Sequence, residues 1–189
     1  MGNERQLISA ERQGMGVENL DWPLYDSLPM VASARQTLIF FQNSGNVVNG
    51  RARTNMKNPG SLPAGEEFLI TGLRMSFRNP TTTPFTVTAL PELNQLINTG
   101  WFDVYREPAT FYEGHLTELF NQAFINGGLA TVDGGGVFEK GLKFKRPIIL
   151  LAVRHFEIKV TLDAPAFAGG FGADTLLYVY LHGIKRRNK

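Results

Sequence analysis

Hydrophobic and polar residues alternate along several stretches of the chain, with a period of two that is typical of β-strands with one buried face. The alternation is clearest at 155–162 and 174–183, where apolar residues recur at every second position. The stretch 66–77 follows the same pattern once a slip of one residue is allowed near Gly72. Glycine inside a strand often marks such a slip, a β-bulge. These stretches predict half-buried strands of an antiparallel sheet.

Shorter apolar or aromatic runs bounded by turn residues extend the pattern over the rest of the chain. The eight strands predicted in this way lie at 36–42, 66–77, 101–106, 110–114, 137–144, 147–153, 155–162 and 174–183. A short helix is predicted at 91–98, because Pro91 and Gly100 stand where helices commonly begin and end, and a second helical turn at 116–124. Many short strands with only one or two short helices predict an all-β sandwich or barrel.

The first 35 residues are predicted to form an extended arm. Residues 1–19 are polar, whereas 20–30 combine apolar side chains with Pro23 and Pro29, which favour an extended chain. The apolar residues of this arm are Trp22, Leu24, Tyr25, Leu28 and Met30. They either pack along their own domain or lie on an adjacent copy, and in the second case the arm is an assembly device. The predicted organisation is an arm at 1–35, a β domain at 36–183 and a basic tail at 184–189.

Composition narrows the class of protein. At 189 residues, of which 43% are hydrophobic, the chain suits one globular domain with a sizeable core. The absence of Cys excludes disulfides and thiolate metal sites, and fits a reducing compartment. The longest apolar run, 147–153, is far shorter than the roughly 20 residues of a membrane-spanning helix, and the N-terminus lacks the apolar core of a signal peptide. We therefore expect a soluble, unexported protein.

Positive charge gathers at the C-terminal end, although the net charge of the whole chain is only +2. The basic residues of this end are Lys185, Arg186, Arg187 and Lys189. Such a segment attracts nucleic acid, anionic lipid headgroups or an acidic neighbouring subunit. It is equally compatible with a solvated end that contributes only to solubility.

The three histidines do not form a recognisable metal site. A cupin-type enzyme holds its metal with a His-x-His pair, a nearby Glu and a later His, and no His-x-His pair occurs here. His115 with Glu118 and His155 with Glu157 are pairs by sequence proximity, and the i, i+2 spacing places the second pair on one face of a strand. We expect each histidine, His182 in the last strand included, to be a surface or hydrogen-bonded residue.

Other catalytic patterns are also missing. The sequence contains no Gly-x-Ser-x-Gly elbow, and the glycine runs at 134–136 and 169–172 lack the setting of a phosphate-binding loop. The sequence therefore predicts a protein that is not an enzyme, with no catalytic residue, no cofactor and no metal site. A cupin-type enzyme is kept as the less favoured reading.

A carbohydrate-binding, lectin-like or spike module is the main alternative to a structural protein. Sandwich lectins use an exposed aromatic platform with a few acidic or amide residues. Trp101, Asp103 and Tyr105 alternate along one predicted strand, so all three are expected on the same face.

Several segments of the chain share a pattern of hydrophobic and turn residues with a known family. In the first half, these segments are Tyr25-Asp-Ser-Leu-Pro-Met30, Thr37-Leu-Ile-Phe-Phe41, and Thr54-Asn-Met56 followed by Leu62-Pro63. In the second half, they are Leu96-Ile-Asn-Thr-Gly-Trp-Phe102, Phe111-Tyr-Glu-Gly-His-Leu116, Phe156-Glu-Ile158 and Leu181-His-Gly-Ile184. In the order and spacing of these residues, most of the chain resembles jelly-roll coat proteins of tailless icosahedral bacteriophages and their metagenomic relatives.

The resemblance implies a single eight-stranded antiparallel jelly roll that self-assembles into an icosahedral virus shell. The family contains double and single jelly rolls, and 189 residues have room for one. The implied partners are copies of the same chain and other capsid proteins, with genome or an internal membrane contacted by the basic tail. The implied location is the virion, assembled in the cytoplasm of the host.

Overall fold

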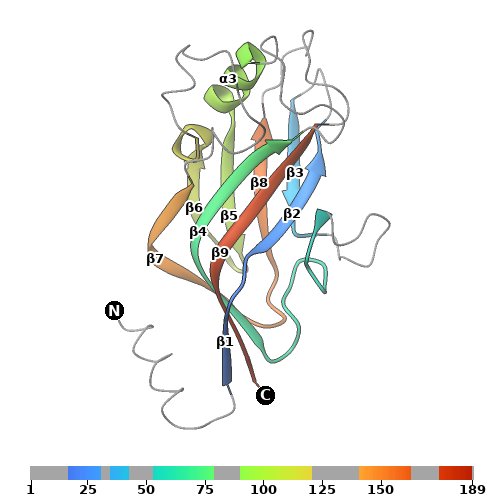
Figure 1. Cartoon of the computed structure of the whole chain (residues 1–189), viewed down its shortest axis with the longest axis vertical. Helices are drawn as coiled ribbons and strands as arrows, with labels where there is room; N and C mark the ends of the chain where they lie inside the picture. Colours follow the sequence, from blue (N-terminus) through green and yellow to red (C-terminus); the bar gives the residue numbers. More distant parts are fainter. Residues whose placement is uncertain are drawn as a thin grey trace.

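The structure, a computed structural model, describes residues 17–30, 35–42, 53–78, 90–120, 141–162 and 175–188. Within these residues, two antiparallel β-sheets lie face to face (Figure 1). The predicted all-β class is therefore confirmed. No helix in the described ranges is both long and apolar enough to cross a bilayer.

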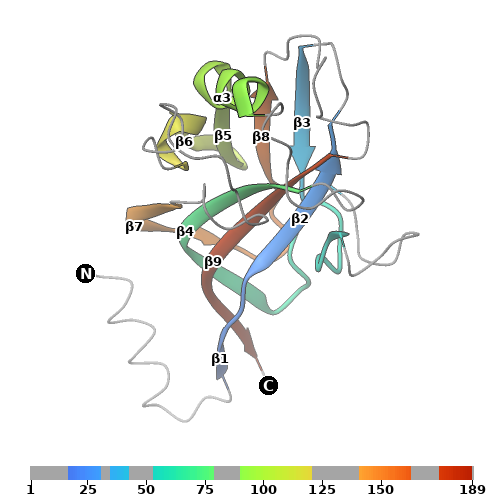
Figure 2. The ribbon, with the colours of Figure 1, turned by 45° about the horizontal axis from the view of Figure 1, so that its top comes forward.

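The strands in chain order are β1 (Val17–Asp21), β2 (Leu24–Pro29), β3 (Gln36–Phe40), β4 (Glu66–Arg78), β5 (Trp101–Arg106), β6 (Ala109–His115), β7 (Leu142–Leu150), β8 (Phe156–Leu162) and β9 (Leu176–Asn188). Among the described elements, the α-helix α3 (Leu90–Thr99) and the 3-10 turn η2 (Leu116–Glu118) accompany these strands. The helix predicted at 91–98 is confirmed, and the predicted turn at 116–124 is observed over its first residues. Figure 2 shows α3 at one end of the sandwich, above β5.

The first sheet has the order β1-β9-β4-β7, with β2 also paired to β9, and the second has the order β3-β8-β5-β6. In the first sheet, β9 lies between β4 on one side and β1 and β2 on the other. The predicted slip near Gly72 is confirmed, because the pairing of β4 shifts between Ile70 and Gly72. Strands β5 and β6 pair with each other and form a hairpin around Glu107.

The core lies between the two sheets and explains the alternation in the sequence. In β8 and the first half of β9, every second residue points inward, and the residues between them lie on the opposite face of their sheet. The inward residues of these two strands are Leu177, Val179, Leu181, Phe156, Ile158, Val160 and Leu162, all buried. On α3, Leu93, Leu96 and Ile97 are buried as well, so the helix covers one end of this core.

Strand β7 corrects the prediction of two separate strands at 137–144 and 147–153. It is one strand, and its pairing with β4 jumps from Lys143 opposite Gly72 to Ile148 opposite Ile70. Residues 144–147 therefore have no partner in that register. Pro147 has no N–H to donate to a ladder, which accounts for an interruption here. In Figure 1, β7 bends away from β4 at the outer side of the sheet.

The two ends of the described chain correct the predicted arm and tail. Residues 17–29 form β1 and β2, both paired with β9, so they belong to the sheet. Residues 184–188 are the last part of β9 and pair with β1 and β4. Hydrogen-bonding partners from distant parts of the chain, which local sequence patterns do not reveal, draw both segments into the sheet. Residues 137–140, the glycine runs at 134–136 and 169–172, and Lys189 lie outside the described residues.

Gly183 on β9 lies close to the backbone of β4. A Cβ built at this position overlaps the carbonyl oxygen of Leu69, which no side chain tolerates without a backbone shift. We expect Gly183→Ala to lower the free energy of unfolding by about 1–3 kcal/mol or more and Tm by about 5 °C. Thermal unfolding measures this. His182→Ala, at an exposed neighbouring position, is the control, and equal losses from both variants would contradict the close contact.

Candidate functional site

The positive charges near the end of β9 are paired within their own sheet. Lys185 Nζ lies 2.7 Å from Glu66 Oε2, and Arg186 Nη1 lies 3.6 Å from Glu67 Oε2. Both carboxylates belong to β4, the neighbouring strand. Of the predicted nucleic-acid or lipid contacts, Lys185 and Arg186 are thus engaged inside the protein, and Arg187 is exposed.

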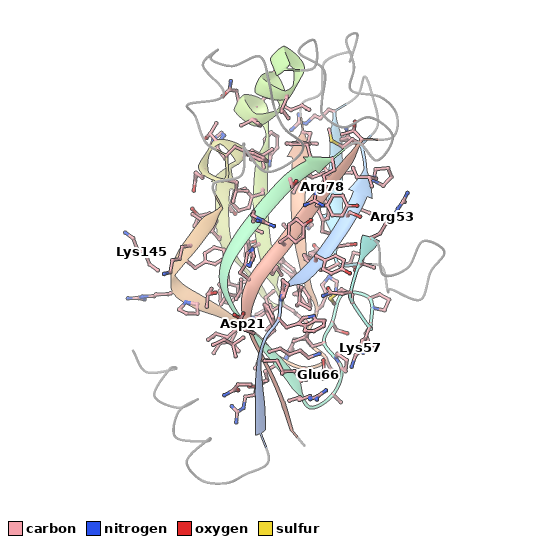
Figure 3. All side chains as sticks on the ribbon, in the orientation of Figure 1. Asp21, Arg53, Lys57, Glu66, Arg78 and Lys145 are labelled. Atoms are coloured by element: carbon pink, nitrogen blue, oxygen red, sulfur yellow. The ribbon has the colours of Figure 1, made fainter. Side chains whose placement is uncertain are left out.

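Glu66 holds two cations at this end of the sheet. Its Oε1 atom accepts a hydrogen bond of 3.3 Å from Lys57 Nζ, while Oε2 accepts from Lys185 (Figure 3 labels Lys57 and Glu66). Burial raises the pKa of Glu66, but the hydrogen bonds and charges of Lys185 and Lys57 outweigh it and hold the pKa below its ordinary value of 4.5. The carboxylate therefore stays charged at neutral pH and joins the start of β4 to the end of β9.

The predicted assembly residues divide into a buried and an accessible group. Leu24 and Met30 are in the core, and Leu28 packs against it, so these three stabilise their own domain. Tyr25 is half-buried, with its ring 6.3 Å from that of Tyr180 on β9. Trp22, between β1 and β2, is 51% exposed. Of the five predicted residues, Trp22 is the one that is available as an apolar anchor for another molecule.

The connection between β7 and β8 carries a second exposed apolar group, which the sequence analysis did not select. Val153 is 75% exposed and Leu151 is 41% exposed. Val153 also has a positive φ of 56°, a conformation that crowds the Cβ atom and is unusual for a β-branched residue. The connection is nevertheless well anchored, since Val153 N donates a 3.1 Å hydrogen bond to Leu62 O and Ala152 forms a bridge with Leu62.

The outer face of the second sheet brings the predicted carbohydrate platform together. Trp101, Asp103 and Tyr105 alternate with the buried Phe102 and Val104, as expected. Both aromatic rings are already engaged by cations of the same face. The guanidinium of Arg35 lies 5.1 Å from the Trp101 ring centroid, and Lys159 Nζ lies 5.7 Å from that of Tyr105.

Charged groups crowd the same face. Burial raises the pKa of Asp103, repulsion from Glu113 raises it further, and Lys159 opposes both. Lys159 Nζ also lies 2.8 Å from Glu157 Oε1. The platform is therefore a connected network of charges and rings.

His155 and Glu157 contact each other, as their predicted common face requires. His155 Nε2 lies 3.2 Å from Glu157 Oε2, and Gln42 Nε2 donates to the same oxygen at 3.3 Å. Burial raises the pKa of Glu157, but Lys159 and His155 outweigh it, so the pKa lies below 4.5. Over the described ranges, no group of three or more His, Asp or Glu side chains is placed to hold a metal ion.

Asp26 on β2 is a buried carboxylate that the sequence analysis did not identify. It is 1% exposed and points into the core among apolar residues. Its Oδ2 accepts from Phe41 N at 2.5 Å and its Oδ1 from Ser27 N at 2.9 Å. Because β2 belongs to the first sheet and Phe41 follows β3 of the second, this carboxylate joins the two sheets. Burial raises the pKa of Asp26 to about 6, although its hydrogen bonds work in the opposite direction.

A groove of about 790 Å³ opens between β6 and the interrupted part of β7. Its base is apolar and aromatic, with Tyr112 and Phe144 in edge-to-face contact at 5.5 Å between ring centroids. Three cations, Lys143, Lys145 and Arg146, line it, and none of the described residues that line it is acidic. The alternation of Lys143, Phe144 and Lys145 before Pro147 is the signal in the sequence that marks this place.

Comparisons with models of known protein families, with curated protein sequences and with solved structures found no match. The function of this chain has to be inferred from its own residues and strand order.

Asp26 predicts an unusual pH dependence of stability. Its pKa is about 6 in the folded protein and 3.8 ordinarily, so the folded state binds more protons between these values. Its contribution to stability therefore grows as the pH falls from 7 to 5, and we expect Tm to rise by about 5 °C over this range. Glu66 and Glu157, with lowered pKa values, lose stabilisation only at lower pH.

Thermal unfolding between pH 5 and 7 measures this effect, and Asp26→Asn is the variant that removes it. The Asn side chain retains one acceptor oxygen but does not titrate. The Tm of the variant should therefore stay constant as the pH falls from 7 to 5, whereas that of the wild type rises. Parallel curves for the two proteins would show that another group titrates.

Proposed function

We propose that this protein is a coat protein with a jelly-roll fold, and that copies of it assemble into the icosahedral shell of a virus. The observation that carries the proposal is the order of strand pairing. Jelly rolls form one of the few sandwich architectures, and they recur in viral capsids, lectins and cupins.

In a jelly roll of eight strands, the chain winds so that the first strand pairs with the last, the second with the seventh, the third with the sixth and the fourth with the fifth. The pairs here are β2 with β9, β3 with β8, β4 with β7 and β5 with β6. The described residues form nine strands because β1 and β2 are separate. Both pair with β9 in continuous register across Trp22 and Pro23, so they are two parts of one interrupted edge strand.

Self-association is supported by the exposed apolar connection between β7 and β8. A left-handed conformation costs a residue such as Val153 about 1–2 kcal/mol. Strain of this kind is retained where the surrounding structure fixes it, and it often marks functional positions. An apolar side chain that is mostly exposed and held in a strained turn contributes little to its own domain. It is well suited to a contact with a neighbouring copy.

Trp22 supplies a second anchor of the kind enriched in interfaces. Single contacts of this size are weak, but a closed symmetric assembly repeats each of them many times. A shell can therefore form without a large apolar patch on the free subunit.

The aromatic platform of Trp101, Asp103 and Tyr105 favours a second candidate, a carbohydrate-binding module. Aromatic faces and carboxylates on one sheet surface suit sugar recognition, although the two rings are already covered by Arg35 and Lys159. Solution mass separates the candidates. A coat protein forms capsomers or larger particles as its concentration rises, whereas a lectin stays a small oligomer and binds glycans.

Val153→Asn tests the assembly contact without weakening the fold. Asn tolerates a positive φ better than Val, so we expect the variant to unfold at the same Tm or a few degrees higher. At the same time, loss of the apolar contact should raise the protein concentration needed for assembly by about tenfold. Multi-angle light scattering over a concentration and salt series measures the assembly.

Arg154→Gln, which changes an exposed polar neighbour on the same connection, is the matched control and should assemble as the wild type does. Unchanged assembly by Val153→Asn would remove this connection from the interface. A wild-type protein that stays monomeric at every concentration would contradict the coat function itself.

A further inference from the structure

The groove between β6 and β7 differs from the other basic regions of the protein in its charge balance. At the end of β9, Lys185 and Arg186 each face a carboxylate of β4. Lys143, Lys145 and Arg146 on β7 are exposed, and none of them forms an ion pair with a carboxylate in the described part of the chain. The positive potential of the first group is largely cancelled, whereas that of the second is open to a partner.

Geometry explains why these cations stand out from the sheet. Residues 144–147 leave the register of β7 with β4, and the strand bends away from its neighbour. Figure 3 shows Lys145 at the outer side of the sandwich, pointing away from it. Cations on the rim of a groove next to an apolar base are arranged to hold an anion that also carries a flat or apolar body.

Aromatic rings supply the surface for such a body. Phe111 on β6 lines the groove and is 43% exposed, and the guanidinium of Arg106 lies 4.1 Å from its ring centroid. Behind it, Tyr112 stacks on Phe102, with ring centroids 5.6 Å apart, and contacts Phe144. Arg106 thus covers one face of the Phe111 ring, and the ring remains 43% exposed beside the three cations that line the groove.

We propose that this groove binds single-stranded nucleic acid, with phosphates on Lys143, Lys145 and Arg146 and a base stacked on Phe111. Cationic grooves with exposed aromatic rings are the usual means by which proteins hold single strands without sequence preference. The groove follows residues 142–148, roughly 20 Å of extended strand, which suits a few nucleotides. A duplex keeps its bases stacked inside and cannot offer them to Phe111.

An anionic membrane surface shares the phosphate chemistry but not the aromatic part. Clustered cations hold lipid headgroups, and acyl chains contact any apolar side chain, whereas the flat ring of a base matches an aromatic face beside a cation. The accessible Phe111 ring beside Arg106 therefore favours nucleic acid. Binding of single-stranded nucleic acid by the groove does not depend on the proposed coat function. Only the identification of that nucleic acid as packaged genome rests on it.

Fluorescence anisotropy with a labelled oligothymidylate of about 12 nucleotides tests the inference on the full chain. We expect salt-dependent binding that is weaker for a duplex of the same length. The triple variant Lys143→Gln, Lys145→Gln and Arg146→Gln should bind at least tenfold more weakly. It should also lower the slope of log affinity against log salt by about 2, since each phosphate contact on a single strand contributes about 0.7.

Two further variants test whether binding depends on the groove residues themselves, on net charge, or on an apolar side chain of any kind. Arg53→Gln, Lys57→Gln and Arg154→Gln together remove the same three charges outside the groove and should leave binding within about twofold. Phe111→Leu keeps an apolar side chain but no ring, and should weaken binding about fivefold with the salt slope unchanged.

Three results would overturn the inference: equal losses from both triple variants, heparin binding as tight as that of oligothymidylate, or binding of phosphatidylglycerol vesicles with no binding of the oligonucleotide. Light scattering on the same samples measures assembly, so failure of the coat function and failure of this inference can be distinguished. Oligonucleotide binding by a protein that never assembles would contradict the coat function alone, and assembly without such binding would contradict this inference alone.

Discussion

The sandwich depends on the pairing of its last strand, β9, with the N-terminal strands β1 and β2. β9 lies between β4 and the two-part edge strand formed by β1 and β2. This arrangement requires a close backbone approach at Gly183 and a charge balance at Glu66, which holds both Lys185 and Lys57. The first and last strands are neighbours, and the strands between them are divided over two sheets. Asp26 then joins those sheets at their edge.

Local sequence patterns predicted the positions of most strands and of the helix, but not which strands pair with each other. The alternation at 155–162 reports burial directly, because β8 is covered on one face along its whole length. The end of β9 was misread as a tail, since Lys185 and Arg186 look solvated until Glu66 and Glu67 are placed beside them. Residues 24–30 look like an arm for the same reason. Their partner, β9, lies about 150 residues away in the sequence.

The candidate surfaces were harder to predict than the strands. Val153 is an ordinary apolar residue in the sequence, and only its exposure and positive φ set it apart. The groove at β7 depends on a jump in register that places Phe144 and Lys145 outside the ladder. The alternation of Trp101, Asp103 and Tyr105 was visible in the sequence, but not the cations that cover the two rings. Each of these features arises from contacts between strands that are distant in sequence.

Under the two proposals, one subunit carries two separate binding surfaces. The apolar connection between β7 and β8 contacts neighbouring copies, and the cationic groove at β6 and β7 binds nucleic acid. Electron cryomicroscopy of the protein at high concentration is the direct test of assembly. We expect rings or closed particles in which Leu151 and Val153 are buried between copies. Isolated subunits throughout, or particles in which this connection faces solvent, would contradict it.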